Sequence, residues 1–350
     1  LRFGMIVASL RCVTFISVPG WTEAAGFSYM LMVLGFFMGY LIIAYVLLPV
    51  YYRYNVISIY SVLGNVLGTS SYQTGSLFFL LSRIVGASAR LYIVTMVVQL
   101  MVCDALGIPF YLTAVLVLVL IALYSASGGI ATIVITDTLQ TALMLIAAGT
   151  AFYFVGRAVV PEGQSFVGFL TDHPHWHFVE PSGPKAWWRQ LLGGASIAVA
   201  MTGLDQDMMQ KNLTVKRLPD AQKNMVLLGA SLLFVNMLFL SLGVFLSEYA
   251  AANGIEAGGD KLFASVVEHP GLPQLLGILF FLGLLAAAFS SADSALTSLA
   301  TAFCVDFLKL STSGSVRTRT SVYIGFMIIV QIVEMAVLEP WERHASRWRR

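Results

Sequence analysis

Charged side chains are scarce in this chain of 350 residues. Lysine, arginine, aspartate and glutamate make up 11% of it, whereas they make up roughly 25% of an average soluble domain. So few charges cannot cover a soluble protein of this length with a hydrated surface, and an ordinary soluble enzyme is therefore excluded. The formal net charge of +2 is too small to indicate a nucleic-acid partner.

Cysteine is also rare, and the familiar catalytic motifs are missing. Cys12, Cys103 and Cys304 lie inside or beside apolar runs, which argues against a disulfide framework and against a CxxC metal site. The sequence has no glycine-rich phosphate loop, nucleophile elbow or HExxH pattern. We therefore expect neither an enzyme nor an organic cofactor.

Apolar runs dominate the rest of the sequence. Hydrophobic residues make up 58% of the chain and form runs of about 20 residues, the length that crosses a bilayer core. We predict an all-α, multi-pass protein of a plasma membrane or bacterial inner membrane, surrounded by lipid. About nine transmembrane helices are expected, the first one partial, at residues 1–19, 27–51, 72–103, 108–124, 130–155, 186–212, 225–249, 272–308 and 321–338.

The two ends of the chain are unusual. The sequence opens inside an apolar run and shows no signal-peptide pattern. Residues 339–350 are polar and basic and follow directly on an apolar span. We predict one transmembrane domain over residues 1–338, expect the tail at 339–350 to lie outside the fold, and interpret the chain as a fragment of a longer protein.

Basic residues indicate how the helices are oriented. Short loops rich in lysine and arginine stay in the cytoplasm. If helix one runs outward, the cytoplasmic loops hold Arg53, Lys211, Lys216, Arg217, Lys223, Lys309, Arg317 and Arg319. The longer outer loops carry acidic residues beside fewer basic ones, and this orientation is therefore favoured.

Two predicted helices contain breaks. Helix one is expected to end at Pro19-Gly20, and helix six to break at Gly193-Gly194 and again at residues 202–207. The two helices lie five spans apart. Paired interrupted helices indicate a secondary transporter built from inverted repeats, with its binding site at the breaks.

Helix eight carries the densest polar group. Ser290, Asp293 and Ser294 fall at positions i, i+3 and i+4 and therefore share one face. Hydroxyl, carboxylate and carbonyl oxygens suit small hard cations, although potassium or a bound water would use similar atoms. The alternative is a packing face whose serine hydroxyls bond to backbone carbonyls of the same helix.

Other ionisable residues in the apolar spans have structural explanations beside functional ones. Asp137 is either a functional acid of helix five or an interfacial carboxylate. Asp205 lies in the broken part of helix six, where it lines a cytoplasmic opening or pairs with Lys211. Glu334 of helix nine is expected to form a structural ion pair with Arg83 or Arg90.

The segment His173-Pro174-His175-Trp176-His177 raises a metal hypothesis. Alternating histidines bind zinc weakly, but this outer loop has no cysteine and no ligand-spaced partner. We therefore expect no metal here, and none elsewhere other than the hard cation of helix eight.

Three motifs resemble the sodium/solute symporter family, which includes sodium-coupled sugar, proline, sialate and iodide transporters. Residues 128–140, GGIATIVITDTLQ, resemble the family signature. Residues 287–294 resemble its sodium-site helix, and 203–206 with 210–211 resemble the cytoplasmic half of its broken sixth core helix. The likeness covers about residues 7–338.

The resemblance implies a leucine-transporter-type core of two inverted five-helix repeats, of which core helices one to nine are present. It implies sodium-coupled symport of a small organic solute by alternating access. The implied sodium ligands are the carbonyls of Val7, Leu10 and Ala287 and the hydroxyls of Ser290 and Ser291. A second sodium site or exit path is implied at Asp137, Asp293 and Ser294, and Ser290 also matches a position of that site. Arg11 departs from the pattern, since some members have serine there.

The solute is expected at the two breaks. The implied lining residues are Thr14, Phe15, Ser17, Met201, Thr202 and Gln206. Sugar-transporting relatives have an asparagine and a tyrosine where this chain has Ala198 and Met201, which disfavours a sugar and slightly favours a carboxylate or amino acid. The alternatives are a proton-coupled carrier of the same fold and a membrane-embedded sensor or enzyme that transports nothing.

Overall fold

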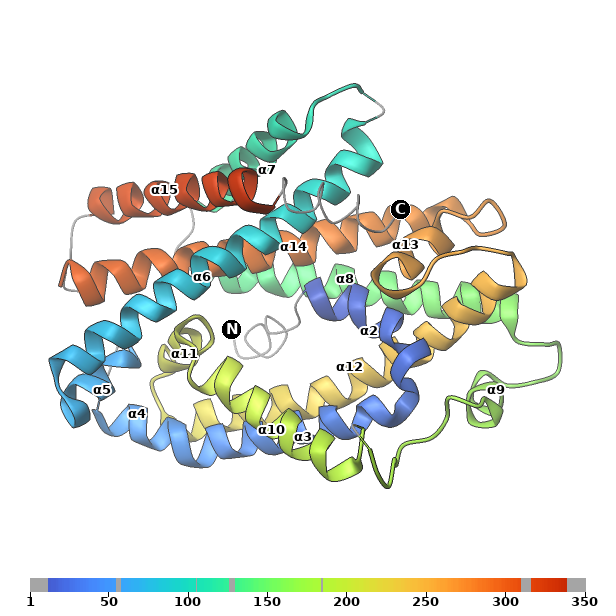
Figure 1. Ribbon diagram of the computed structural model, residues 1–350, viewed down its shortest axis with the longest axis horizontal. Helices are drawn as coiled ribbons and strands as arrows, with labels where there is room; N and C mark the ends of the chain where they lie inside the picture. Colours follow the sequence, from blue (N-terminus) through green and yellow to red (C-terminus); the bar gives the residue numbers. More distant parts are fainter. Residues whose placement is uncertain are drawn as a thin grey trace. The chain divides into compact units, whose positions relative to one another are not determined.

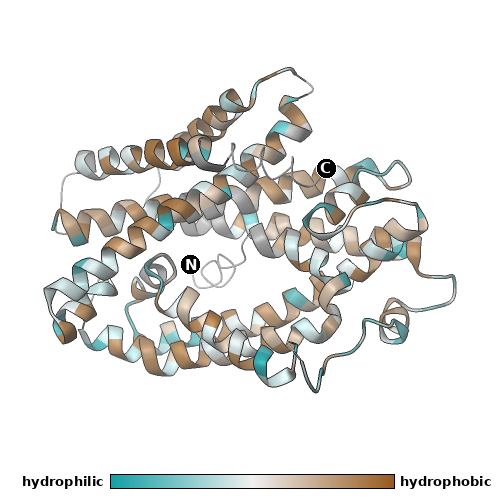
Figure 2. Ribbon diagram, viewed as in Figure 1, coloured by the Kyte–Doolittle hydropathy of each residue, from teal (hydrophilic) through white to brown (hydrophobic). Residues whose placement is uncertain are grey.

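The fold was obtained as a computed structural model, which describes residues 12–54, 58–104, 106–125, 130–183, 185–309 and 316–338. These residues form helices and connections and contain no strand, as predicted (Figure 1). Hydrophobic residues run along most of the helices, and hydrophilic ones gather in the connections (Figure 2).

The chain divides into two compact units, whose boundaries fall within α4, α8 and α14, between Leu204 and Asp205, and between Thr214 and Val215. The first unit holds α2 (Cys12–Ala25), η1 (Gly26–Ser28), α3 (Tyr29–Ile42), η2 (Ile43–Leu47), most of α8 (Ile130–Val159), α9 (Phe166–Asp172), α10 (Trp187–Ala198), η4 (Val199–Gly203), α12 (Leu218–Ala252), η5 (Gly259–Lys261), α13 (Leu262–Val267) and the start of α14 (Gln274–Ala302). The second holds most of α4 (Leu48–Tyr54), α5 (Tyr60–Leu67), α6 (Thr69–Val98), η3 (Gln99–Cys103), α7 (Phe110–Ser125), α11 (Gln206–Leu213), the rest of α14, η6 (Phe303–Phe307), α15 (Val316–Val333) and η7 (Glu334–Leu338).

Helices α3 and α10 of the first unit touch through their backbones. A Cβ atom on Gly35 would overlap the carbonyl of Leu191, and one on Gly194 would overlap that of Met32. Such contacts need glycine, because any side chain would push the helices apart. The predicted break at Gly193-Gly194 is therefore wrong: α10 runs through both residues, and Gly194 serves close packing.

Helix α2 also continues where a break is predicted. It passes through Pro19 and ends at Ala25, so the predicted end at Pro19-Gly20 is wrong. Proline is tolerated inside membrane helices where neighbouring helices and hydroxyl groups compensate for the lost hydrogen bond. Here α12 packs closely on α2, and the Thr22 hydroxyl lies 3.4 Å from the carbonyl oxygens of Val18 and Leu240.

In the second unit α6 packs against α5, α7 and α15. Within the described residues, four helical segments are long and apolar enough to cross a membrane: Ser17–Tyr54, Thr69–Met96, Thr138–Val159 and Leu218–Ala252. Shorter apolar helices are Phe110–Leu123, Gln274–Ala286, Ser294–Phe307 and Thr320–Ala336. The protein is therefore a multi-pass membrane protein, as predicted.

Candidate functional site

The sixth apolar segment breaks at Leu204 and Asp205. A π-helical turn, η4, ends at Gly203, and α11 begins at Gln206. Leu204 leaves the helical conformation, with φ −104° and ψ 14°. This confirms the predicted interruption at residues 202–207, and π-helical turns are frequent at functional sites.

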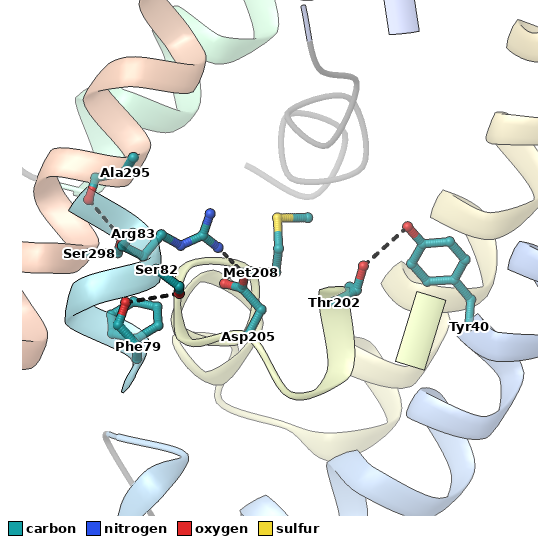
Figure 3. A network of polar contacts seen from close by, with 9 residues as sticks. All are labelled: Tyr40, Phe79, Ser82, Arg83, Thr202, Asp205, Met208, Ala295 and Ser298. Carbon is teal, nitrogen blue, oxygen red and sulfur yellow. Dashed lines mark hydrogen bonds and ion pairs between the residues drawn. The ribbon is translucent and has the colours of Figure 1, made fainter. Parts of the chain in front are cut away.

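Asp205 holds the start of α11 in place. Its Oδ2 atom forms an ion pair with Arg83 of α6, and its Oδ1 atom accepts the amide of Met208 at 3.4 Å (Figure 3). The two charged side chains are 7% and 17% exposed, for Arg83 and Asp205 respectively. Arg83 is therefore an ion-pair partner of Asp205. The side chain of Lys211, which the sequence suggested as a partner, lies outside the described part.

Gln206, a predicted solute-lining residue, has a structural contact. It is buried, and its Oε1 atom accepts the backbone amide of Ile59 at 2.9 Å. Because Ile59 lies in the turn before α5, this bond ties α11 to that turn within the second unit.

The residues just before the break belong to the first unit. Thr202 is buried, and its hydroxyl lies 3.4 Å from the hydroxyl of Tyr40 on α3 (Figure 3). Met201 is 57% exposed. A Cβ on Gly39 would lie 2.6 Å from the Cβ of Ala198, so position 198 faces the α3 backbone. A larger side chain at position 198 would not fit that contact.

Phe15 lies inside an aromatic cluster of the first unit. Its ring is 6.0 Å from Phe239, 5.3 Å from Phe263 and 5.5 Å from Phe280, centroid to centroid. The side chain is completely buried, and Ser17 is buried on the same helix. The predicted lining residue Thr14 lies on α2 with its side chain outside the described part.

Helix α14 runs without a break through residues 287–294. The backbone therefore gives Ser290, Asp293 and Ser294 the helical spacing that the sequence predicts, and Ser294 is buried. The side chains of Ala287, Ser290, Ser291 and Asp293, and that of Asp137 on α8, lie outside the described part. So do the predicted helix-one ligands Val7 and Leu10 in their entirety.

A buried acid that the sequence analysis did not single out lies near the end of the eighth apolar span. Asp306 on η6 accepts hydrogen bonds from Ser58, Tyr72 and Ser76. In the sequence, this residue could have been identified as a carboxylate inside an apolar run. In the same unit, fully buried Glu334 accepts a hydrogen bond from Thr95 at 2.8 Å.

Residues 173–178, here called the histidine strap, attach to the turn between α2 and α3. The His175 carbonyl accepts the Phe27 amide at 3.0 Å. The ring of Trp176 lies 4.5 Å from the ring of Phe27, centroid to centroid. Backbone and aromatic contacts thus fix the strap to the turn.

The strap histidines have acidic neighbours. The Nε2 atom of His173 lies 3.1 Å from Oε1 of Glu248, and that of His177 lies 3.2 Å from Oε1 of Glu180. No group of three His, Cys, Asp or Glu residues in the described part is arranged to hold a metal ion.

Comparisons with known proteins agree with this fold. A profile of the sodium:solute symporter family matches residues 4–346. A putative sodium-dependent multivitamin transporter of Drosophila melanogaster is 24% identical over 88% of this chain and 52% of its own. A sodium/myo-inositol cotransporter of Mus musculus is 23% identical over 95% of this chain and 52% of its own.

Bacterial symporters are similar as well. The sodium/sialic acid symporter of Proteus mirabilis is 22% identical over 93% of this chain and 66% of its own. A solved sodium-coupled sialic acid symporter, bound to substrate and open outward, superposes with a TM-score of 0.77 at 20% identity, covering 96% of this chain and 73% of that one. The chain spans about half the length of the animal relatives it matches.

Proposed function

Because the chain belongs to the sodium:solute symporter family, we propose that it uses the inward sodium gradient to import a small organic solute. The observation that carries the proposal is the break at Leu204–Asp205 in a fold similar to that of a sodium-coupled symporter. Irregular backbone in a membrane segment is tolerated where it is buried in protein or lines a cavity, and broken helices form the binding sites of such transporters.

In this proposal, sodium binds the carbonyls of Val7, Leu10 and Ala287 and the hydroxyls of Ser290 and Ser291. Sodium favours an outward-open state, the solute then binds, and inward opening releases both. The coupling is a difference in binding free energy between states. One charge that moves through 100 mV supplies roughly 2.3 kcal/mol before any concentration gradient is counted.

The solute would bind beside Thr202 and Met201, near the break. Ala198 packs against Gly39 and offers no hydrogen bond, which disfavours a polyol, since such a site needs several polar partners. The N-terminus of α11 is capped by Asp205, so a solute carboxylate would need a different partner. A thermal-shift screen of sugars, amino acids and carboxylates, with and without sodium, identifies the class.

Uptake measurements test the coupling. At fixed pH, replacing sodium with choline should abolish uptake of the solute found in the screen. Uptake that depends on pH but not on sodium would favour a proton-coupled carrier, in which Asp137 or Asp293 takes the proton.

The double change Ser290→Ala with Ser291→Ala should raise the half-saturating sodium concentration about tenfold, equivalent to about 1.4 kcal/mol. The matched control is Ser298→Ala, because Ser298 on the same helix is buried and its hydroxyl donates to the Ala295 carbonyl at 2.9 Å. An unchanged sodium requirement in the double variant would remove these serines from the sodium site.

A further inference from the structure

Asp306 is the centre of a buried group of oxygen atoms. Its side chain is 5% exposed. The Tyr72 hydroxyl donates to Oδ1 at 2.8 Å, while the hydroxyls of Ser76 and Ser58 donate to Oδ2 at 3.0 and 3.1 Å. The carboxylate and three hydroxyls thus bring five oxygen atoms together.

Three separate segments of the second unit build this group. Asp306 lies on the π-helical turn η6, Tyr72 and Ser76 lie one turn apart on α6, and Ser58 precedes α5. Both serines are buried. Because their positions depend on the packing of all three segments, the oxygen atoms are arranged by the fold.

In the described part of the chain, the charge of Asp306 has no cationic counterpart at ion-pair distance. Among the described residues, no lysine, arginine or histidine lies within 4.0 Å of its carboxylate. The guanidinium of Arg83 forms its ion pair with Asp205. Burying a carboxylate is unfavourable unless its charge is compensated, and three neutral hydroxyls leave one negative charge in place.

The pKa of Tyr60, which lies outside the apolar spans, is affected by the same excess of negative charge. Burial raises the pKa of its hydroxyl most, and the carboxylates of Asp205 and Asp306 raise it further. Arg83 acts in the opposite direction. The charges of two carboxylates and one guanidinium therefore all act on this hydroxyl.

We propose that Asp306, with the hydroxyls of Ser58, Tyr72 and Ser76, binds one sodium ion. The oxygen-only set suits a hard cation, and a single carboxylate matches a monovalent ion better than Ca²⁺, which usually takes several. This inference rests on the proposed function for the identity of the ion. At 1.5 Å per helical residue, Asp306 lies roughly 22 Å along the helix from Ser291, so the two sites are separate.

Sodium at this site would join the turn before α5 and helix α6 to η6. The turn belongs to a loop that the distribution of basic residues places on the cytoplasmic side. The site would therefore bind an ion that enters or leaves the protein on the cytoplasmic side.

Equilibrium binding of radioactive sodium tests the site. The purified chain is placed in lipid nanodiscs at fixed pH, with choline as the replacement ion. Asp306→Asn should bind one sodium ion fewer per chain than the unaltered protein. Asp260→Asn, which removes an exposed acid of η5, should bind as the unaltered protein does.

Tyr72→Phe provides a second variant that keeps the aromatic ring and removes one oxygen. It should weaken the Asp306-dependent binding about tenfold. This variant keeps the proposal testable if Asp306→Asn does not fold. Unchanged sodium binding in Tyr72→Phe and in every folded Asp306→Asn sample would overturn the proposal, as would an Asp306-dependent uptake of protons in place of sodium.

The failure of this site can be told apart from the failure of the proposed function. The Ser290→Ala, Ser291→Ala protein lacks the coupling site but keeps Asp306, and should retain the Asp306-dependent ion. If that protein loses all sodium binding while Asp306→Asn loses none, the coupling site stands and the site at Asp306 does not.

Discussion

At the scale of single residues, Gly243 sets how closely α12 approaches α2. A Cβ atom there would overlap the Thr22 hydroxyl and lie 2.5 Å from the Pro19 carbonyl oxygen. Gly243→Ala should therefore lower the free energy of unfolding by about 1–3 kcal/mol, measured by thermal or denaturant unfolding in detergent.

Gly149 on α8 is the control for that change. A Cβ there would have no neighbour within 4 Å, and alanine is the better helix former. Gly149→Ala should be neutral or stabilising. Equal destabilisation by both alanines would show that loss of glycine, and not the contact at Gly243, is responsible.

A second residue-scale prediction concerns the ion pair at the helix break. Arg83→Gln or Asp205→Asn alone breaks this largely buried ion pair, at a cost of about 3–5 kcal/mol. The double variant should lose less than the sum of the two changes. The free energy of unfolding is measured for the unaltered protein, the two single variants and the double variant, and gives the coupling energy between the two side chains. If the effects of the single changes add up to that of the double change, the ion pair is contradicted.

At the scale of the elements, the sequence predicted the helices well because long apolar runs leave little alternative in a membrane. The predicted helix breaks at Gly193-Gly194 and at Pro19 were wrong. Glycine pairs occur both at breaks and at close helix contacts, and only the neighbouring helix distinguishes the two. Here the neighbours are α3 and α12.

The partners of the polar residues were harder to predict than the helices. Arg83 lies on α6, far along the chain from Asp205, and the sequence indicated only a cytoplasmic opening or the nearby Lys211 for this acid. Gln206 is predicted to contact the solute, and its amide oxygen also accepts the backbone amide of Ile59, a contact that the sequence did not indicate. These contacts depend on which helices become neighbours, which local patterns do not specify.

The histidine strap gives an element-scale prediction about pH. Burial lowers the pKa of His175, and repulsion from His173 and His177 lowers it further, while Glu23 and Glu248 act in the opposite direction. The docked strap therefore binds a proton on His175 less readily than the undocked strap. This contribution to docking is complete above pH ~6.5 and is lost as the pH falls below that value.

Hydrogen exchange at the Phe27 amide measures this effect, because that amide donates to the His175 carbonyl. Between pH 7 and 5, about the range in which histidine changes charge, its protection should decrease after correction for the intrinsic rate. The decrease should be smaller in His175→Gln. If both proteins show the same pH dependence, His175 does not control strap docking.

At the scale of the whole molecule, the orientation in the membrane follows from the loops. A cysteine introduced at Gln164, between α8 and α9, should react with an impermeant thiol reagent added outside intact cells. A cysteine at Arg217, before α12, should react only after permeabilisation. The background protein carries serine at positions 12, 103 and 304, and the opposite labelling pattern would reverse the predicted orientation.

The direct backbone contact between α3 and α10 has a practical consequence for spectroscopy. Helices that touch at Gly35 and Gly194 cannot slide or separate without losing that fit, so we expect the pair to move as one rigid body. Spin labels at Leu34 and Leu192, both exposed, would report a constant distance whichever ligands are present. That pair supplies an internal reference distance against which distance changes elsewhere in the chain can be compared.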